Sequence, residues 1–233
     1  MDFSKRHREI ELMDDIHISI DDLQATYHDI NSANRLLGGD SDVLQALKKM
    51  ILENPKQQYS IIDVGCGDGA MLRSIAVMFR KLDISVELLG VDLNAKAIDL
   101  AREASIAFPE IEFKVQDALK MDGVKADFVI STLTMHHIDE ANISHFLKGL
   151  TKIASIGIVI SDLQRSRFAY YLFQLFSVIF IKTEIAKNDG LVSIRSGFLK
   201  KELRTYSMVL PAYQHSIEWK WAFRYLWVMR LKS

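Results

Sequence analysis

The sequence predicts an α/β fold built on a mostly parallel sheet with helices on both faces. From Tyr59 onward, short apolar runs alternate with amphipathic helical stretches, which is typical of strands joined by crossover helices. Five of these runs are largely apolar rather than alternating, as expected of strands covered on both faces: residues 60–64, 86–91, 111–115, 127–131 and 156–161. Two more β-type runs, 216–221 and 224–230, are close enough to form an antiparallel hairpin. The seven strands together predict a Rossmann-like sheet that ends in this hairpin.

The remaining stretches predict helices. Apolar side chains recur at helical spacing after the first strand, and Asn94 can cap the helix that follows the second. Residues 1–57 read as helical, with a break at Gly38-Gly39, and no linker separates them from the first strand. We therefore expect a helical N-terminal cap on one α/β domain, 58–233, which carries an insertion or lid at about 164–200. Inside that insertion, Asn-Asp-Gly at 188–190 predicts a turn.

Composition narrows the class of partner. The chain has 29 Lys and Arg against 30 Asp and Glu, a formal net charge of -1, so nothing favours a nucleic-acid partner. Cys66 is the only cysteine, which excludes an internal disulfide and a cysteine-rich zinc cluster, and we expect no metal. The N-terminus lacks the pattern of a signal peptide. These features predict a cytoplasmic protein that acts on a small molecule.

Residues 168–181 form the most apolar stretch of the chain. The stretch is interrupted by Gln174 and is shorter than the roughly 20 residues needed to cross a bilayer, so we expect no membrane span. A helix that is apolar nearly all round has to be buried, cover a ligand, or meet a partner or a membrane surface. A core helix, a homodimer contact, an interfacial contact and a lid over an apolar ligand all remain open.

A glycine-rich turn follows the first strand. Glycine lets a ligand lie against the backbone, and amides at a helix start can receive a negatively charged group. A dinucleotide-binding chain would carry Gly-x-Gly-x-x-Gly, whereas this turn carries Gly-x-Gly-x-Gly preceded by an acid. We expect Cys66 to be a small residue tolerated in the turn rather than a nucleophile. The predicted cofactor-binding residues of the turn are Asp63, Gly65, Cys66, Gly67, Asp68 and Gly69.

Polar residues also follow the next three strands. Asp92 and Leu93 end the second strand, Asp117 and Ala118 follow the third, and Ser131 ends the fourth. Ligands of open α/β sheets bind outside the carboxyl ends of the strands, where a carboxylate such as Asp92 can accept both hydroxyls of a ribose. One acid at a strand end is as readily a helix cap or a turn residue. The joint arrangement predicts that these five residues extend the cofactor site.

The turn and the acids resemble the motifs of class I S-adenosylmethionine-dependent methyltransferases, in which an acid precedes this glycine pattern. The resemblance covers about residues 59–163, and these enzymes also end with an antiparallel strand. It implies that 65–69 pass under the methionine part of S-adenosylmethionine, that Asp63 helps to place its amino group, and that Asp117 contacts the adenine amino group. Glycine spacing and the hairpin disfavour a nicotinamide-dependent oxidoreductase. A protein that binds the cofactor without catalysis remains an alternative.

Two histidines and an acid follow the fourth and fifth strands. His136 and His137 lie beside the expected sulfonium, and histidine is the usual general base near neutral pH. Their run resembles a loop of methyltransferases related to the ubiquinone and menaquinone biosynthesis enzymes, where such histidines more often shape the site than perform chemistry. Asp162 could orient a substrate hydroxyl or a histidine. We predict all three as catalytic candidates, with a structural role as the alternative for each.

Four segments also resemble O-methyltransferases found alongside polyketide synthases in bacteria: 11–15, 34–39, 161–165 and 189–195. This resemblance implies a phenolic or enolic acceptor and O-methylation, with C- or N-methylation as the alternative. Arg165 could hold an anionic acceptor. The candidate acceptor contacts are Arg35, Arg165, Tyr170 and Arg195.

Overall fold

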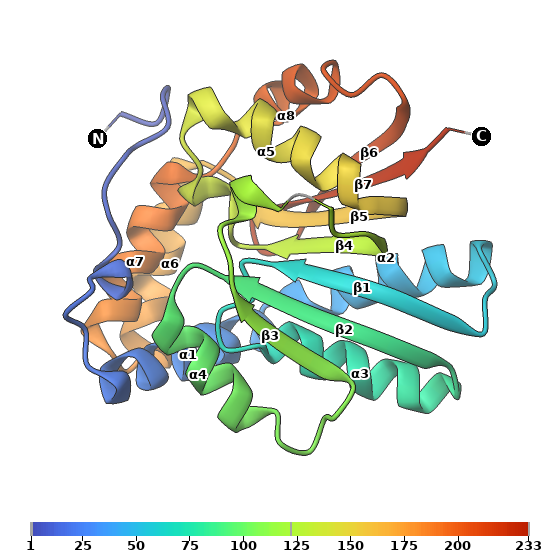
Figure 1. The fold of residues 1–233 in the computed structure, drawn as a ribbon. Helices are drawn as coiled ribbons and strands as arrows, with labels where there is room; N and C mark the ends of the chain where they lie inside the picture. Colours follow the sequence, from blue (N-terminus) through green and yellow to red (C-terminus); the bar gives the residue numbers. More distant parts are fainter. Residues whose placement is uncertain (1, 122, 233) are drawn as a thin grey trace.

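The computed structural model of the protein describes residues 2–121 and 123–232. A sheet of seven strands crosses the molecule in the order β3-β2-β1-β4-β5-β7-β6 (Figure 1). Strands β1 to β5 run parallel, and β7 lies antiparallel between β5 and β6. The predicted sheet and its closing hairpin are confirmed. The strands are β1 (Gln58–Val64), β2 (Ser85–Asp92), β3 (Ile111–Val115), β4 (Ala126–Thr132), β5 (Ala154–Leu163), β6 (Tyr213–Lys220) and β7 (Arg224–Leu231).

Helices cover both faces of the sheet. Helices α2, α3 and α4 pack on one face against Tyr59 and Ile61 of β1, and α5 and α8 pack on the other, the face of Ile62 and Val64. Successive side chains of a strand point to opposite faces, so a strand covered on both sides has to be apolar at nearly every position. The helices are α1 (Ile20–Leu36), α2 (Gly39–Glu53), α3 (Ala70–Leu82), α4 (Ala95–Ala104), α5 (Glu140–Ile153), α6 (Arg167–Phe180), α7 (Glu184–Ser196) and α8 (Lys200–Ser207), with the 3₁₀ helices η1 (Leu12–Asp14), η2 (Ala118–Lys120) and η3 (Met135–His137).

Three helices gather at the end of the sheet to which the parallel strands point. Figure 1 shows α1, α6 and α7 there, together with the N-terminal segment. The buried carboxylate of Asp29 in α1 accepts hydrogen bonds from the backbone N–H of Lys182 (2.9 Å) and Thr183 (2.7 Å), between α6 and α7. These contacts join α1 to the inserted helices and enclose the carboxyl edge of the sheet, where a ligand would bind.

The expected helical cap over residues 1–57 begins only at Ile20. Before that residue the described chain is helical at η1 alone, so the prediction of helix is wrong for most of residues 2–19. The polar groups of this segment form hydrogen bonds with other elements instead. The backbone N–H of His7 donates to the carbonyl of Arg195 (3.1 Å), and the guanidinium of Arg6 donates to the carbonyls of His136 and Ile138. Tertiary contacts therefore replace local helical hydrogen bonds.

The predicted turn at 188–190 is also wrong, because these residues lie inside α7. The side chain of Asp189 is buried and accepts hydrogen bonds from the backbone N–H of Leu12 (2.8 Å) and Met13 (2.9 Å). Gly190 lies under the ring of Phe173, where an added Cβ would come within 2.2 Å of ring atom Cζ. Asp and Gly are thus used for long-range packing here and not for a change of chain direction.

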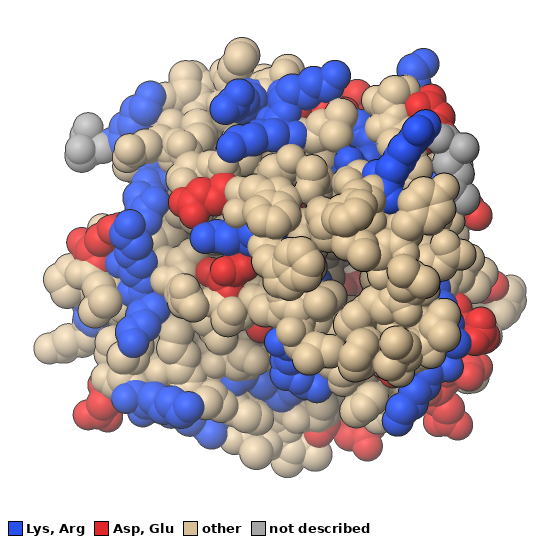
Figure 2. All heavy atoms as spheres, turned by 180° about the vertical axis from the view of Figure 1, so that it is seen from behind, with Lys and Arg blue, Asp and Glu red and all other residues tan. Residues whose placement is uncertain are grey.

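Helix α6 has one buried side and one exposed apolar side. Figure 1 shows α6 on the far side of the molecule, and Figure 2, seen from behind, shows side chains other than Lys, Arg, Asp and Glu gathered on that side. Among the described residues, no helix combines the length and apolarity needed to span a bilayer. The large apolar side chains that α6 exposes are Phe168, Tyr171, Leu175, Val178, Ile179 and Phe180.

Candidate active site

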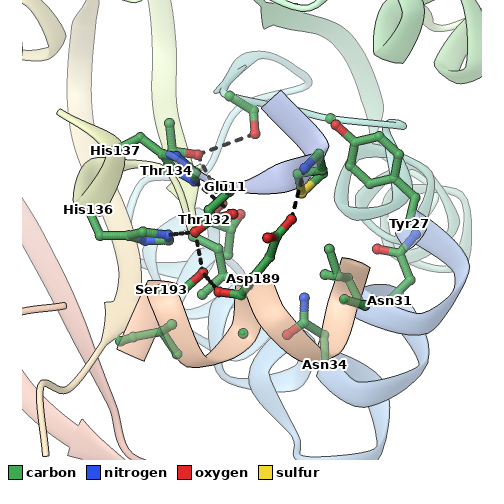
Figure 3. A pocket seen from close by; sticks show the side chains of 18 of the residues that line it. Glu11, Tyr27, Asn31, Asn34, Thr132, Thr134, His136, His137, Asp189 and Ser193 are labelled. Atoms are coloured by element: carbon green, nitrogen blue, oxygen red, sulfur yellow. Dashed lines mark hydrogen bonds and ion pairs between the residues drawn. The ribbon is translucent and has the colours of Figure 1, made fainter. Parts of the chain in front are cut away.

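A cavity of about 1010 Å³ lies at the carboxyl ends of the parallel strands. It runs from the glycine turn after β1, past the ends of β2 and β4, to the inner sides of α6 and α7 (Figure 3). Ligand sites in proteins commonly measure about 300–1,000 Å³, so this one has room for a cofactor and a second small molecule. We call the walls at the glycine turn and after β2 and β3 the cofactor part of the cavity, and the walls from α6 and α7 the acceptor part.

The glycine turn forms the floor of the cofactor part. Gly65, Gly67 and Gly69 have φ angles of 77°, 52° and 77°, which are strained for residues with a side chain. A Cβ on Gly65 would lie 2.2 Å from Oγ1 of Thr134, and one on Gly67 would lie 2.7 Å from the ring of Tyr27. Gly65 and Gly67 line the cavity, whereas Gly69 precedes α3 outside it. The close approach of neighbouring side chains explains why only glycine fits.

Asp63 is a buried carboxylate near the end of β1, just before this turn. Its Oδ1 has no hydrogen-bond partner among the described residues, although the side chain lines the cavity and the residue is only 1% exposed. Burial raises the pKa of Asp63 to about 8, and the negative charge of Asp92 adds to the shift. A buried carboxylate without a partner is costly unless a ligand supplies a donor or a positive charge. The amino group of S-adenosylmethionine would supply both, so the residues present fit this cofactor.

The other acids predicted for the cofactor lie on the adjoining wall. Asp92 accepts hydrogen bonds from the backbone N–H of Gly67 and Asn94, both at 2.9 Å, and burial raises its pKa. Asp117 accepts a hydrogen bond from the backbone N–H of Leu119 (2.9 Å). Each carboxylate oxygen has two lone pairs, so both side chains can still accept from a ligand. The predicted residues on this wall of the cavity are Asp92, Leu93, Asp117 and Ala118.

Three predicted residues have mainly local roles in this structure. Cys66 lines the cavity, but burial raises the pKa of its thiol, which opposes its use as a nucleophile. Asp68 also lines the cavity, and it accepts from Nδ2 of Asn31 (2.9 Å) in α1. Ser131 lies outside the lining, where its hydroxyl donates to the carbonyl of Val64 (3.0 Å) and joins β4 to β1.

The predicted catalytic residues do come together at the far side of the cavity. Asp162, at the end of β5, accepts from the backbone N–H of His136 (3.0 Å), and its Oδ1 lies 2.7 Å from Nδ1 of the same residue. Both side chains are almost fully buried, and His136 and His137 line the cavity. Asp162 itself does not line it. The carboxylate therefore positions His136 and does not face a ligand.

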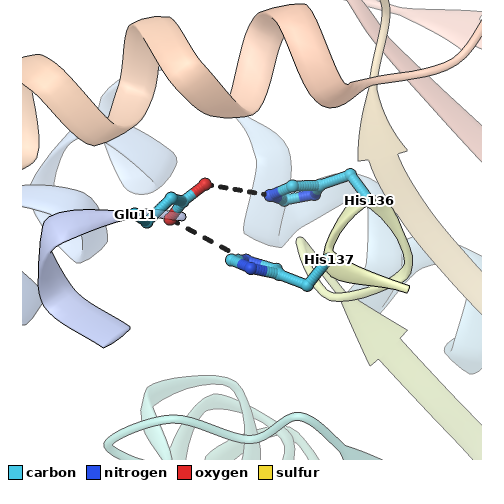
Figure 4. Close-up of side chains that lie close together, drawn as sticks. All are labelled: Glu11, His136 and His137. Carbon is cyan, nitrogen blue, oxygen red and sulfur yellow. Dashed lines mark ion pairs between the residues drawn. The ribbon is translucent and has the colours of Figure 1, made fainter. Parts of the chain in front are cut away.

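Glu11 completes this group, and sequence reasoning did not select it as a site residue. Its Oε1 lies 3.5 Å from Nε2 of His136, and its Oε2 lies 3.8 Å from Nε2 of His137 (Figure 4). The hydroxyl of Ser193 donates to Glu11 from α7 (Figure 3). We name Glu11, His136 and His137 the Glu-His-His cluster. The three come from two segments far apart in sequence, so no spacing pattern links them.

Charge in this cluster is tightly balanced. Burial alone would lower the pKa of His136, but the carboxylates of Asp162 and Glu11 outweigh it and raise that pKa to about 10. Burial likewise opposes ionisation of Glu11, and the two imidazoles outweigh it, so the pKa of Glu11 is lowered. Burial also opposes ionisation of Asp162, whose pKa His136 lowers. The structure thus favours positive charge between two buried carboxylates.

The acceptor part of the cavity faces this cluster across an apolar wall. The wall comes from the end of β5, the inner sides of α6 and α7, and the chain between these helices. Its apolar residues are Leu163, Ala169, Leu172, Phe173, Phe176, Ile181 and Ile194.

None of the four candidate acceptor contacts lines the cavity. Arg35 is exposed and donates to the hydroxyl of Ser32 (3.3 Å). Arg165 is fully buried, where it pairs with Glu202 and donates to backbone carbonyls. The ring of Tyr170 packs against that of Phe3, and Arg195 pairs with Glu9 (3.3 Å). Arg165, Tyr170 and Arg195 therefore join the N-terminal segment to the C-terminal half of the chain.

Comparisons with known proteins agree with this architecture. Residues 61–157 match the methyltransferase domain family. Among curated proteins, none matches the sequence. The plantazolicin methyltransferase BpumL, solved with S-adenosylhomocysteine (SAH) and a pentazolic desmethylplantazolicin analogue, is similar at a TM-score of 0.67 and 16% identity, over 91% of this chain and 98% of that one.

Two further solved structures share the fold. Magnesium protoporphyrin IX methyltransferase from Synechocystis PCC 6803, with bound SAH, has a TM-score of 0.60 and 14% identity, over 84% of each chain. A methyltransferase dependent on S-adenosylmethionine (SAM) from Aquifex aeolicus has a TM-score of 0.61 and 13% identity, over 92% of this chain and 100% of that one.

The sheet order, the glycine turn and the row of acids define the class I methyltransferase fold. Residues 61–157 thus carry a methyltransferase domain, and the chain has the class I methyltransferase fold that its sequence predicts.

Proposed function

We propose that this enzyme methylates an oxygen atom of a small, largely apolar phenol or enol. The observation that carries the proposal is the acceptor part of the cavity, where polar groups of the Glu-His-His cluster face an apolar wall from α6 and α7. An acceptor with one ionisable hydroxyl and an otherwise apolar body would satisfy both sides. A strongly charged acceptor would leave its charge against Phe173 and Phe176, which is costly.

Each group of residues has a distinct task in this proposal. Bound SAM supplies an electrophilic methyl group on a sulfonium sulfur. Asp63 holds the amino end of the cofactor, Asp92 the ribose and Asp117 the adenine, while the glycine turn admits the cofactor to the backbone. The Glu-His-His cluster holds the acceptor hydroxyl, His137 takes up its proton, and Asp162 fixes the ring of His136. Such positioning can supply much of the rate of an in-line displacement.

Similar proteins do not decide which atom is methylated. One of them is the CMeT domain of a citrinin polyketide synthase, at 12% identity and a TM-score of 0.62, over 79% of this chain and 50% of that one. The preference for oxygen is supported instead by the acid and imidazole groups at the acceptor wall, because a hydroxyl has to lose a proton. C- or N-methylation, and cofactor binding without catalysis, are the competing outcomes.

The test is a transfer assay with SAM carrying a labelled methyl group. Phenols and 1,3-diketones with hydrocarbon substituents are compared with amines of the same carbon skeleton, and products are located by mass spectrometry and NMR. We expect methyl ethers from the phenols or enols, better with apolar substituents than with charged ones. Methylated amines or new C–C bonds would overturn the assignment to oxygen. SAH binding with no product from any compound would favour the non-catalytic alternative.

A further inference from the structure

The Glu-His-His cluster has the geometry of a metal site. The Nε2 atoms of His136 and His137 face the same carboxylate, that of Glu11, at 3.5 and 3.8 Å (Figure 4). One ligand atom from each residue lies within 4.8 Å of the other two. Bonds of about 2.1 Å to a tetrahedral zinc ion would place neighbouring ligand atoms about 3.4 Å apart. A cation can therefore enter with only small movements of the side chains.

Each ligand is held by a neighbour that leaves its metal-facing atom available. Nδ1 of His136 lies 2.7 Å from Asp162, and Nδ1 of His137 lies 3.4 Å from Asp14. A histidine that ligates a metal almost always gives its other ring N–H to a carboxylate or carbonyl, which fixes its tautomer and orientation. Ser193 donates to Glu11. The imidazole of His136 is thus oriented as a metal ligand is, and that of His137 lies at ion-pair distance from a carboxylate on its other nitrogen.

An unpartnered atom points into the cluster. Nε2 of His136 has no hydrogen-bond partner among the described residues, although the residue is only 5% exposed, and its contact with Glu11 is an ion-pair distance without hydrogen-bond geometry. Three carboxylates, those of Glu11, Asp14 and Asp162, surround the two rings. The guanidinium of Arg6 donates to the backbone carbonyls of His136 and Ile138. Among the described residues, the imidazoles are the only positive groups that form ion pairs with these three carboxylates.

We propose that Glu11, His136 and His137 bind one first-row divalent cation of the Zn²⁺ type. Imidazole ligands suit zinc and its neighbours, whereas Mg²⁺ prefers oxygen ligands alone. The sequence predicted no metal, because Glu11 and the histidines are far apart in the chain and are brought together by long-range contacts such as the bonds of Asp189 to the backbone of η1.

Three protein ligands leave a coordination position open, as in catalytic zinc sites. All three ligands line the cavity, so that position faces the acceptor part. This step rests on the proposed function: the acceptor hydroxyl would bind the cation through oxygen, its pKa would fall, and its proton would pass to water at the cavity mouth. The cation then takes over the activation of the hydroxyl from the side chains of the Glu-His-His cluster.

The test measures metal binding without any acceptor. Protein stripped with a chelator is titrated with Zn²⁺ by calorimetry and with Co²⁺ by visible absorption. We expect one ion per chain and a cobalt spectrum typical of four-coordination. Glu11→Gln and His137→Ala should weaken binding at least 100-fold, and Asp162→Asn about 10- to 100-fold. His28→Ala, which removes an exposed histidine of α1, should bind as the wild type does.

Thermal unfolding of each variant confirms that it is folded, and the near-isosteric Glu11→Gln keeps an acceptor for Ser193. No Zn²⁺ or Co²⁺ binding at millimolar concentration would overturn the proposal, as would binding that is equal in Glu11→Gln, His137→Ala and the wild type. O-methylation by metal-free protein that also fails to bind metal would refute the cation and leave the proposed function intact. Metal binding together with only N- or C-methylation would support the cation and refute the proposed O-methylation.

Discussion

Replacing Asp63 by Asn should stabilise the protein without cofactor while weakening cofactor binding. The carboxyl has a pKa of about 8 when folded and about 4 in an unfolded chain. Between these values the folded state keeps a proton that the unfolded chain has lost, so the free energy of unfolding falls as pH rises. The two pKa values correspond to a loss of at most about 5–6 kcal/mol between pH 4 and pH 8. Asn does not titrate and avoids this loss.

The assay is urea unfolding of both proteins from pH 5 to pH 9, without cofactor. We expect the free energy of unfolding of Asp63→Asn to exceed that of the wild type by an amount that grows steadily up to about pH 8. Above that pH the difference should level off. Binding of SAH, followed by calorimetry at pH 7.5, should be about 10- to 100-fold weaker in the variant, because a charge-assisted hydrogen bond is lost. A stability difference that does not change with pH, or equal SAH affinity, would refute this account of Asp63.

Three further substitutions test other parts of the structure. Gly65→Ala should lose roughly 1–3 kcal/mol of stability and most SAH affinity, because its φ is 77° and a Cβ would overlap a neighbour. The control Gly149→Ala, in a helix with open space around it, should instead gain about 0.4–1 kcal/mol of stability in urea unfolding. Phe176→Ala should raise the KM for an apolar acceptor about 10-fold while the KM for SAM is kept, whereas Val178→Ala on the exposed side of α6 should change neither; equal effects would contradict the assigned wall. Arg165→Met should lower the free energy of unfolding by roughly 3 kcal/mol in thermal unfolding and leave the KM for the acceptor unaltered. A large change in that KM would indicate that Arg165 contacts the acceptor.

The sheet, and most of the residues that line the cavity at its carboxyl edge, could be predicted because their signals are local. A strand covered on both faces is apolar along its whole length, and a turn such as that at Gly65 and Gly67 leaves a glycine pattern in the sequence. Asp92 and Asp117 directly follow their strands, and the carboxyl ends of parallel strands meet at one edge. Once the parallel order of the strands is known, the positions of these acids in the chain place them on one wall of the cavity.

The acceptor part could not be predicted in the same way. Glu11 reaches His136 only because Asp189 caps η1 and Arg6 binds the loop of the histidines, and neither contact leaves a local pattern. Arg165 looked like a substrate contact because it is charged and follows β5, but burial beside Glu202 gives it a structural partner instead. Segments 11–15 and 189–195 can both be recognised as motifs in the sequence, but only the folded structure shows that they contact each other.

A crystal structure with bound SAH tests the central claim most directly. The account predicts the amino group of SAH beside Oδ1 of Asp63, the ribose hydroxyls on Asp92, the adenine by Asp117, and the sulfur directed toward the acceptor part of the cavity. The space between that sulfur and the Glu-His-His cluster should remain open to an acceptor. SAH bound elsewhere, or with its sulfur directed away from the cluster, would contradict the account.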